Sequence, residues 1–323
     1  MNQYFEGIIL NATNARALGH QELIQSLWSG YGEILKVQLV DGDYESIILK
    51  YIELPENSNH PRGWNTNRSH QRKIKSYNVE TAWYKQWSQY CHQDCRVPKC
   101  LATASQDNSQ LIVMEDLDAA GFHLRKSVLS SMEVKACLKW LAQFHGTFLD
   151  AKPDKLWESG TYWHLATRPD EFGKMKEGLL KQHAAKIDNK LSSAKYKTLV
   201  HGDAKVANFC FAESGQDVAA VDFQYVGAGC GMKDIAYFLG SCLDEHDCLR
   251  DEERYLDYYF TELKQVVANN DSVNALELEN EWRELYAWAW TDFYRFLSGW
   301  MPDHHKIHTY TKRLADKVFK ELL

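Results

Sequence analysis

A short run of polar residues between positions 201 and 208 has the residue types of a phosphoryl-transfer centre. His201, Asp203, Lys205 and Asn208 are separated by two, two and three positions, and Asp222 follows a second apolar run. Phosphoryl transfer needs a carboxylate that accepts the proton of an attacking hydroxyl, oxygen ligands for Mg²⁺, and positive charge along the phosphates. Asp203 suits the first role and Lys205 the last, while Asn208 and Asp222 offer the hard oxygen ligands that Mg²⁺ prefers.

Apolar runs around this motif predict the strands that position it. Residues 198–200 lead into the loop that Asp203 opens, and a turn-rich segment joins residues 209–211 to residues 218–221. This pattern predicts a β-hairpin that brings Asn208 and Asp222 to one edge. The alternative is a chance motif match in a polar loop, since a motif is a hypothesis until its context confirms it.

The first third of the chain contains a second hairpin signal. Residues 34–40 and 46–52 are β-rich and are separated by an Asp-Gly-Asp turn, and Asp-Gly between such runs is a strong hairpin signal. Lys50 lies within the second run, where a lysine needs a carboxylate or phosphate partner.

Glu80 is the expected partner of Lys50. It lies beside the apolar face of a helix predicted over residues 69–90. A strand lysine paired to a helix glutamate is the arrangement that holds a lysine on the α- and β-phosphates of ATP. The alternative is that Glu80 pairs with Lys75 or Lys85 on a solvated helix surface.

Two further segments fit a nucleotide site. Gly30 and Gly32 precede the 34–40 strand and are expected to fold over phosphates, although a plain turn explains them almost as well. Met114 ends a short apolar strand that runs into an acidic segment resembling the hinge between two lobes. Backbone groups near Glu115 and Leu117 are expected to hold an adenine edge.

Composition limits the class of protein. The chain has 323 residues, a net charge of −7 and a pI near 6.0, so neither nucleic acid nor an anionic membrane is an expected partner. It has neither an 18-residue apolar run nor a secretory leader pattern. Eight scattered cysteines indicate reduced thiols and a cytoplasmic location. A zinc site at Cys91, His92 and Cys95 lacks a second ligand pair, so structural thiols are preferred.

The motifs together resemble the aminoglycoside phosphotransferase and choline kinase superfamily, and within it the ecdysteroid-kinase-like family. The resemblance extends from Gly30 to about Leu243, and Lys205 departs from the residue that many relatives have there. The residues that carry it are Lys50, Glu80, the segment 111–117, His201-Gly202-Asp203, Asp222-Phe223-Gln224 and the stretch 234–239.

This resemblance implies an α+β, bilobal protein-kinase-like fold. Residues 1–115 are expected to form a small N-terminal lobe with an antiparallel sheet and one flanking helix, which binds the nucleotide. Residues 116–323 are expected to form a larger, mainly helical C-terminal lobe for catalysis and acceptor binding. The implied cofactors are ATP and Mg²⁺.

The resemblance also indicates a small-molecule hydroxyl as the acceptor. Gly202 replaces the arginine of protein kinases, and the 12 positions from Asp222 to Asp234 leave no room for a peptide-docking activation segment. Choline-like, steroid, sugar and aminoglycoside alcohols all remain open, as does the oligomeric state. A kinase-like module that binds nucleotide without transfer is the alternative.

In this superfamily the acceptor pocket lies where the later helices meet the catalytic loop. Helices are predicted over residues 251–268, 277–298 and 306–322, and most of their aromatic residues are expected to pack in the core. A cation over aromatic rings would be favoured in such a pocket, which allows an amine-bearing alcohol. The candidate acceptor residues are Trp290, Asp292, Tyr294 and Trp300.

Two segments have no assigned role. A basic run over residues 60–75 is either a solvated helix start or an anion-attracting rim. The polar and aromatic segment 157–170 is expected to be an ordered loop.

Overall fold

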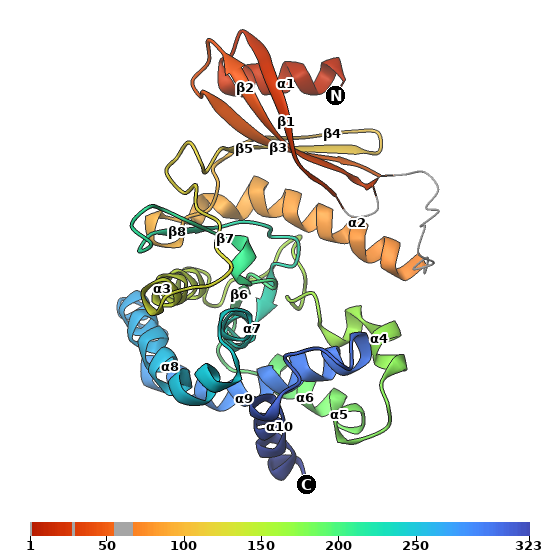
Figure 1. Cartoon of the computed structure of the whole chain (residues 1–323), viewed down its shortest axis with the longest axis vertical. Coiled ribbons are helices and arrows are strands. Elements are labelled where there is room, and N and C mark those ends of the chain that lie inside the picture. Colours follow the sequence, from red (N-terminus) through yellow and green to blue (C-terminus); the bar gives the residue numbers. More distant parts are fainter. Residues whose placement is uncertain (1, 28–29, 55–66) are drawn as a thin grey trace. The chain divides into compact units, whose positions relative to one another are not determined.

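The computed structural model describes residues 2–27, 30–54 and 67–323 (Figure 1). The chain divides into two compact units. Residues 1–124 and 210–221 form the first unit, and residues 125–209 and 222–323 form the second. The architecture is α+β and bilobal, as the resemblance implies, with a five-stranded sheet in the first unit and mainly helices in the second.

The first unit is built on an antiparallel sheet with the strand order β1-β2-β3-β5-β4. Its third strand is central, between β2 and β5, so β3 is hydrogen-bonded along both edges. The strands are β1 (Ala17–Ser26), β2 (Gly32–Val40), β3 (Ser46–Glu53), β4 (Cys100–Gln106) and β5 (Ser109–Glu115).

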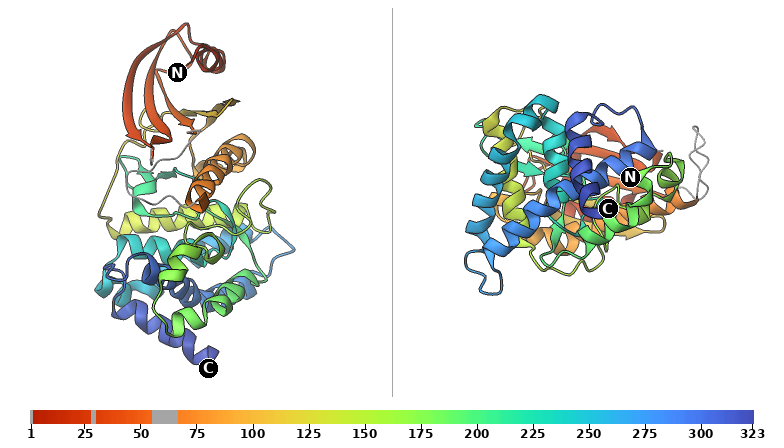
Figure 2. Two further views of the ribbon diagram at one scale, coloured as in Figure 1. Left: turned by 90° about the vertical axis from the view of Figure 1, so that its right-hand side faces the viewer. Right: turned by 90° about the horizontal axis from the view of Figure 1, so that it is seen from below.

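Alternation along β3 decides what each face of the sheet contacts. Ile47 and Leu49 point to a core shared with Phe5 and Ile9 of helix α1 (Gln3–Thr13). Lys50 is the residue after Leu49, and because successive side chains of a strand point to opposite faces, Lys50 points to the other face of the sheet. Figure 1 and Figure 2 show α1 lying across one face of the sheet.

Helix α2 (Asn67–Ala82) contacts the other face of the sheet. Its Tyr77 is buried in a cluster with Leu27, Tyr31 and Ile52. The helix predicted over 69–90 ends earlier than expected, at Ala82. The chain continues as a π-helical turn, Trp83–Trp87, and a 3₁₀ turn, Ser88–Tyr90.

Three elements of the first unit, α1, β1 and β4, were missing from the sequence prediction. α1 is a second flanking helix, and its ends are fixed locally: the Asn2 side chain accepts from the Phe5 N–H, and Asn14 adopts a left-handed conformation. β1 is an exposed edge strand, which explains why its sequence lacks the apolar run on which the strand predictions depended.

The hairpin predicted from the catalytic motif is confirmed. β7 (Phe209–Phe211) pairs with β8 (Val218–Ala220), so Asn208 and Asp222 flank its two ends. Within the first unit, Cys210 and Ala219 of this hairpin pack against Leu117.

The second unit is a helical body with one more small sheet, in which β6 (Thr198–Val200) pairs with β9 (Gly227–Gly229). A capping box of Ser130 and Glu133 starts its first long helix. The helices are α3 (Ser131–Thr147), α4 (Pro169–Lys174), α5 (Leu179–Gln182), α6 (Ala184–Ser192), α7 (Met232–Cys242), α8 (Glu245–Val267), α9 (Ala275–Trp300) and α10 (Thr309–Leu322).

Helix α7 forms the centre of this unit. Residues 232–240 are buried without interruption, as expected of a helix enclosed on every side. The helices predicted over 251–268 and 277–298 are confirmed as α8 and α9. The last helix starts at Thr309 rather than Lys306, because the His308 side chain caps it by accepting from the Thr311 N–H. Within the described residues, no helix is long and apolar enough to cross a membrane.

Candidate active site

The catalytic loop starts where β6 ends, and its turn depends on Gly202. This residue has φ +82°, and a Cβ added there would lie 2.2 Å from the Tyr225 carbonyl oxygen and 2.8 Å from the Thr161 nitrogen. Its own carbonyl accepts a hydrogen bond of 3.1 Å from the Tyr162 N–H. The loop is therefore held on both sides by backbone, at a position where only glycine fits.

Asp234 of α7 fixes the backbone of this loop by hydrogen bonds. Its two carboxylate oxygens accept hydrogen bonds from the backbone N–H groups of His201 (2.5 Å) and Gly202 (2.9 Å). The His145 ring contacts the same carboxylate at 3.2 Å and the Tyr259 hydroxyl at 2.8 Å. All of these groups are buried, so the loop geometry is fixed by a satisfied polar network. In the sequence, Asp234 is part of the stretch 234–239 that carries the family resemblance, but its role in holding the catalytic loop was not predicted.

Asp203 is a buried carboxylate with two side-chain donors. Its Oδ2 atom accepts hydrogen bonds from Lys205 Nζ at 2.9 Å and Asn208 Nδ2 at 3.1 Å. Burial raises the pKa of Asp203, the Lys205 ammonium lowers it, and the negative charge of Asp222 raises it again, with a net increase. A carboxylate with a raised pKa is a stronger base than an ordinary aspartate.

His201 contacts the backbone of Asp203, and a catalytic role for its side chain stays a prediction. Its Nδ1 atom accepts a hydrogen bond of 3.2 Å from the Asp203 N–H. The ring is fully buried and stacks within 4.5 Å of the Phe223 ring.

Asn208 and Asp222 have the donor chemistry of a hard-cation site. The Asn208 amide nitrogen donates to the Asp203 carbonyl at 2.8 Å as well as to its carboxylate, which leaves the amide oxygen for a cation. The charge of Asp222 acts on both Asp203 and Lys205. Asp222 has φ +69°, an uncommon backbone conformation that recurs at functional sites. Neighbouring carboxylates that disfavour each other's ionisation fit a site for Mg²⁺.

The Lys50–Glu80 ion pair is confirmed. The Lys50 ammonium lies 2.6 Å from Glu80 Oε2, and the two residues are 3% and 2% exposed. The two-residue period of the strand turns the Lys50 side chain toward α2, which places its ammonium beside Glu80.

Gly30 lies between β1 and β2, and Gly32 is the first residue of β2. Both glycines have positive φ, +74° and +126°. A Cβ at Gly32 would lie 2.0 Å from the Tyr51 carbonyl oxygen. Position 32 therefore requires glycine for strand pairing, and a phosphate-binding role for either glycine stays a prediction.

The expected hinge follows β5, and some of its backbone groups are already hydrogen-bonded within the protein. The Glu115 N–H donates to the Lys99 carbonyl at 2.9 Å, and the Leu117 carbonyl accepts from the Phe122 N–H at 2.8 Å. Met114 is buried opposite Ile48 of β3. The Leu117 N–H has no hydrogen-bond acceptor within the described residues, and its contact with an adenine edge stays a prediction.

The side chains of the two residues before Leu117 hold this segment in place. Arg96 NH2 lies 2.6 Å from each carboxylate oxygen of Glu115. Buried Asp116 accepts from Ser46 Oγ at 2.6 Å and Lys36 Nζ at 2.8 Å. Burial alone would raise the pKa of Asp116, but Lys36 and Ser46 outweigh it, and the pKa is lowered. The sequence contained no sign of this brace.

The candidate acceptor residues on α9 have mainly packing contacts. Asp292 is fully buried and accepts from Arg295 Nε at 2.8 Å. Trp290 is also fully buried, edge-on to Tyr310. Trp300 is 40% exposed and stacks on Phe296, and Tyr294 is half-buried. These contacts favour the core alternative, and an acceptor role for the four residues stays a prediction.

Segment 157–170 contacts the catalytic loop through the Tyr162 N–H and also holds the residues that follow Asp222. The Trp157 indole N–H donates to the Gln224 carbonyl at 2.8 Å, and the Thr161 N–H donates to the Tyr225 carbonyl at 3.1 Å. Of the basic run 60–75, residues 60–66 lie outside the described residues, and the remainder forms the start of α2.

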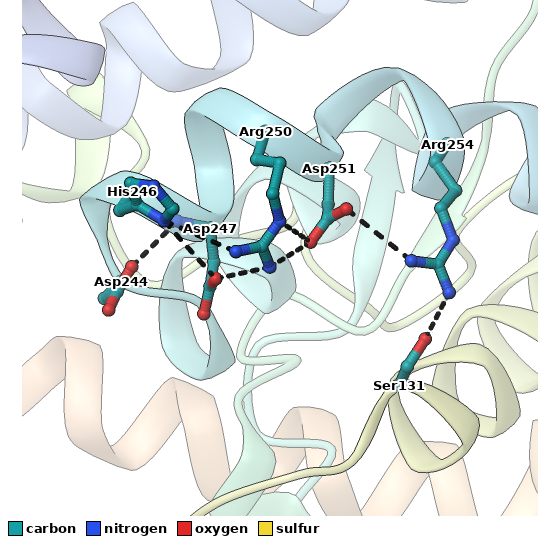
Figure 3. Close-up of polar contacts among 7 residues, drawn as sticks. All are labelled: Ser131, Asp244, His246, Asp247, Arg250, Asp251 and Arg254. Carbon is teal, nitrogen blue, oxygen red and sulfur yellow. Dashed lines mark hydrogen bonds and ion pairs between the residues drawn. The ribbon is translucent and has the colours of Figure 1, made fainter.

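One further group of side chains is close enough to share a cation, within the described ranges. Asp244, His246 and Asp247 lie at the start of α8 (Figure 3). Asp244 caps the helix by accepting from the Asp247 N–H, and Asp247 forms an ion pair with Arg250 at 2.6 Å. These are exposed carboxylates already used in helix capping and ion pairing, so we assign no metal to them.

Comparison with solved structures supports the fold. An amicoumacin kinase in complex with AMP-PNP, Ca²⁺ and Ami matches with a TM-score of 0.57 at 15% identity, over 93% of this chain and 91% of the other. An ethanolamine kinase from Plasmodium vivax matches at 12% identity over 94% and 84% of the two chains. Its TM-score of 0.49 is too low to support an argument. None of the curated proteins matches this sequence.

A family model gives the assignment. The model described as the ecdysteroid kinase-like family matches residues 63–155 and 147–271, which together are more than half of the chain. The geometry of the buried loop at Asp203 and the kinase-like fold agree with that match. The chain therefore belongs to the ecdysteroid kinase-like family and is a small-molecule phosphotransferase.

Proposed function

We propose that this enzyme transfers the γ-phosphoryl group of Mg·ATP to a hydroxyl of a small molecule, with Asp203 as the catalytic base. The observation that supports this most directly is the buried Asp203 carboxylate, held by Lys205 and Asn208 in a loop anchored to Asp234. Fixed orientation and a raised pKa are the two properties that a general base requires.

In the proposed reaction, the acceptor hydroxyl donates its hydrogen bond to Asp203, and its proton passes to that carboxylate as the oxygen attacks phosphorus. Lys205 is 2.9 Å from the same carboxylate and supplies positive charge for the transferred phosphoryl group. The bond to the leaving ADP oxygen breaks, and ADP carries away the electron pair. Phosphoryl transfer depends mainly on such positioning and charge stabilisation.

For the nucleotide, we propose binding by the first 115 residues and catalysis by residues 116–323. Lys50, oriented by Glu80, would contact the α- and β-phosphates, and the Leu117 N–H would hold the adenine edge. Mg²⁺ held by Asn208 and Asp222 would neutralise charge on the β- and γ-phosphates.

The test is Asp203→Asn, which keeps the shape of the side chain and removes its basicity. We expect kcat to fall by about two to four orders of magnitude while the ATP dissociation constant changes only a few-fold. Asp217→Asn, in the exposed turn of the hairpin, is the matched control and should retain wild-type turnover. Activity is read as ADP formed with a library of alcohols, and binding by calorimetry.

Near-native turnover in Asp203→Asn would contradict the catalytic assignment. ATP binding without turnover in either protein would favour the alternative, a module that holds nucleotide without transfer.

A further inference from the structure

The ammonium group of Lys306 lies over aromatic rings and acts electrostatically on the catalytic carboxylate of Asp203. It lies in the loop between α9 and α10 and is half-buried. Its Nζ atom is 5.2 Å from the centre of the Tyr237 ring and 5.7 Å from that of Phe293. Both rings belong to a buried cluster of the second unit, which also contains Trp163 and Phe296.

The Tyr237 ring links this cation to Asp203. The pKa of Tyr237 is raised by burial, by the charge of Asp203 and by hydrogen bonding to Tyr162 and Asp203. Burial lowers the pKa of Lys306 to about 8, against the raising influence of Cys242 and Asp203, while Lys205 lowers it further. Lys306 and Lys205 therefore both lie within electrostatic reach of the same catalytic carboxylate.

Lys306 differs from the other cation in this aromatic cluster. The Arg168 guanidinium lies over the rings of Tyr162 and Phe296, and it is neutralised by Glu171 at 3.1 Å. Within residues 2–27, 30–54 and 67–323, no carboxylate lies within ion-pair distance of the Lys306 ammonium. Its charge is therefore not neutralised by a carboxylate of the described residues, and it acts electrostatically on Asp203.

We propose that Lys306 is a specificity-determining residue that makes the enzyme select uncharged or anionic alcohols and reject alcohols that carry an amine. This inference rests on the proposed function, because it assumes that the acceptor hydroxyl reaches Asp203. It narrows the acceptor classes that the sequence left open.

The physical reason is that the cation position is already occupied. The sequence allowed an amine-bearing acceptor because a cation is stabilised over aromatic faces. Here the protein places its own ammonium over two other rings of the second unit, Tyr237 and Phe293, close enough to Asp203 to act on its charge. A second positive charge in the same half-buried space would be repelled at reduced dielectric, whereas a hydroxyl lone pair or a carboxylate would be attracted.

The test uses a pair of alcohols with the same shape and different charge, choline and 3,3-dimethyl-1-butanol, with 4-hydroxybutyrate as an anionic member. ADP formation is measured for wild type, Lys306→Met and Lys306→Arg. Methionine keeps the aliphatic stem on the rings and removes the charge. Lys312→Met, on the exposed side of α10, is the matched control.

Wild type should prefer 3,3-dimethyl-1-butanol over choline in kcat/KM by about tenfold or more, the scale of a modest charge repulsion. Lys306→Met should reduce this ratio at least five-fold, mainly through the KM of choline. Lys306→Arg and Lys312→Met should keep the wild-type ratio.

The inference is overturned if wild type prefers choline, or if Lys306→Met leaves the order of acceptors unchanged, including the case in which neither protein uses any of the three. Failure of the proposed function is read separately from acceptor-free Mg·ATP hydrolysis. An equal hydrolysis rate in wild type and Asp203→Asn would reject the catalytic role of Asp203, whatever the acceptor ratio.

Discussion

The buried ion pair of the first unit offers a quantitative test of how the fold holds its nucleotide lysine. We consider Lys50→Met, Glu80→Gln and the double variant. Both substitutions keep the approximate volume of the side chain and remove one charge. The 2.6 Å contact between Lys50 and Glu80 lies on the α2 side of central strand β3.

The expected cost follows from burial. Removing one partner of a buried ion pair costs about 3 kcal/mol or more, because the remaining charge loses its counter-charge away from water. Each single variant should therefore lower the local stability of β3 by about 3 kcal/mol, which is roughly a hundred-fold in an opening equilibrium. The double variant should be less destabilised than the sum of the two by at least about 2 kcal/mol, as expected for residues in direct contact.

Hydrogen exchange of the β3 amides, Ser46–Glu53, measures this opening free energy. ATP use, measured in parallel, should fall in each single variant and fall little further in the double variant. The control is Arg16→Met, which removes a 3.0 Å ion pair with Asp41 in the same unit whose side chains are 74% and 68% exposed. Such a surface pair contributes at most about 1 kcal/mol, so β3 exchange should barely change.

Strictly additive losses, in exchange and in ATP use, would refute the reasoning. They would mean that the contact between the two side chains contributes nothing beyond each residue alone. Another acid, such as Glu53, would then have to serve Lys50.

Three further outcomes are expected. Because the base must be ionised and the pKa of Asp203 is raised, chiefly by burial, kcat should fall on the acid side with an apparent pKa above the roughly 3.9 of an ordinary aspartate; a profile flat down to pH 4 contradicts this. Asp222→Ala should abolish productive Mg·ATP binding in calorimetry, and unchanged affinity would exclude Asp222 as a metal ligand. Gly202→Ala should abolish activity and lower the Tm, because its Cβ would meet the Tyr225 carbonyl oxygen at 2.2 Å; Gly173→Ala, where a Cβ has nothing within 4 Å, should do neither, and equal behaviour of the two would refute the steric argument.

Much of the local structure followed from sequence patterns. Short β-rich or apolar runs located β2, β3 and β5, and the Asp-Gly turn located the hairpin whose second strand contains Lys50. Helical periodicity located α8 and α9. The polar edge strand β1 and the helix α1 were not predicted, because neither has a strong apolar pattern. A helix-capping residue such as Asn2 is too common in sequences to predict a helix by itself.

The sequence by itself determined which chemistry is available, because the types and spacing of His201, Asp203 and Asn208 are local properties of one loop. Only the tertiary structure decided which groups act on that loop from elsewhere in the chain. Asp234 anchors the loop from α7, 31 positions beyond Asp203, and Lys306 reaches the catalytic carboxylate's surroundings through the Tyr237 ring. Their partners are set by helix packing, and contacts between residues so far apart depend on burial and geometry that no local spacing encodes.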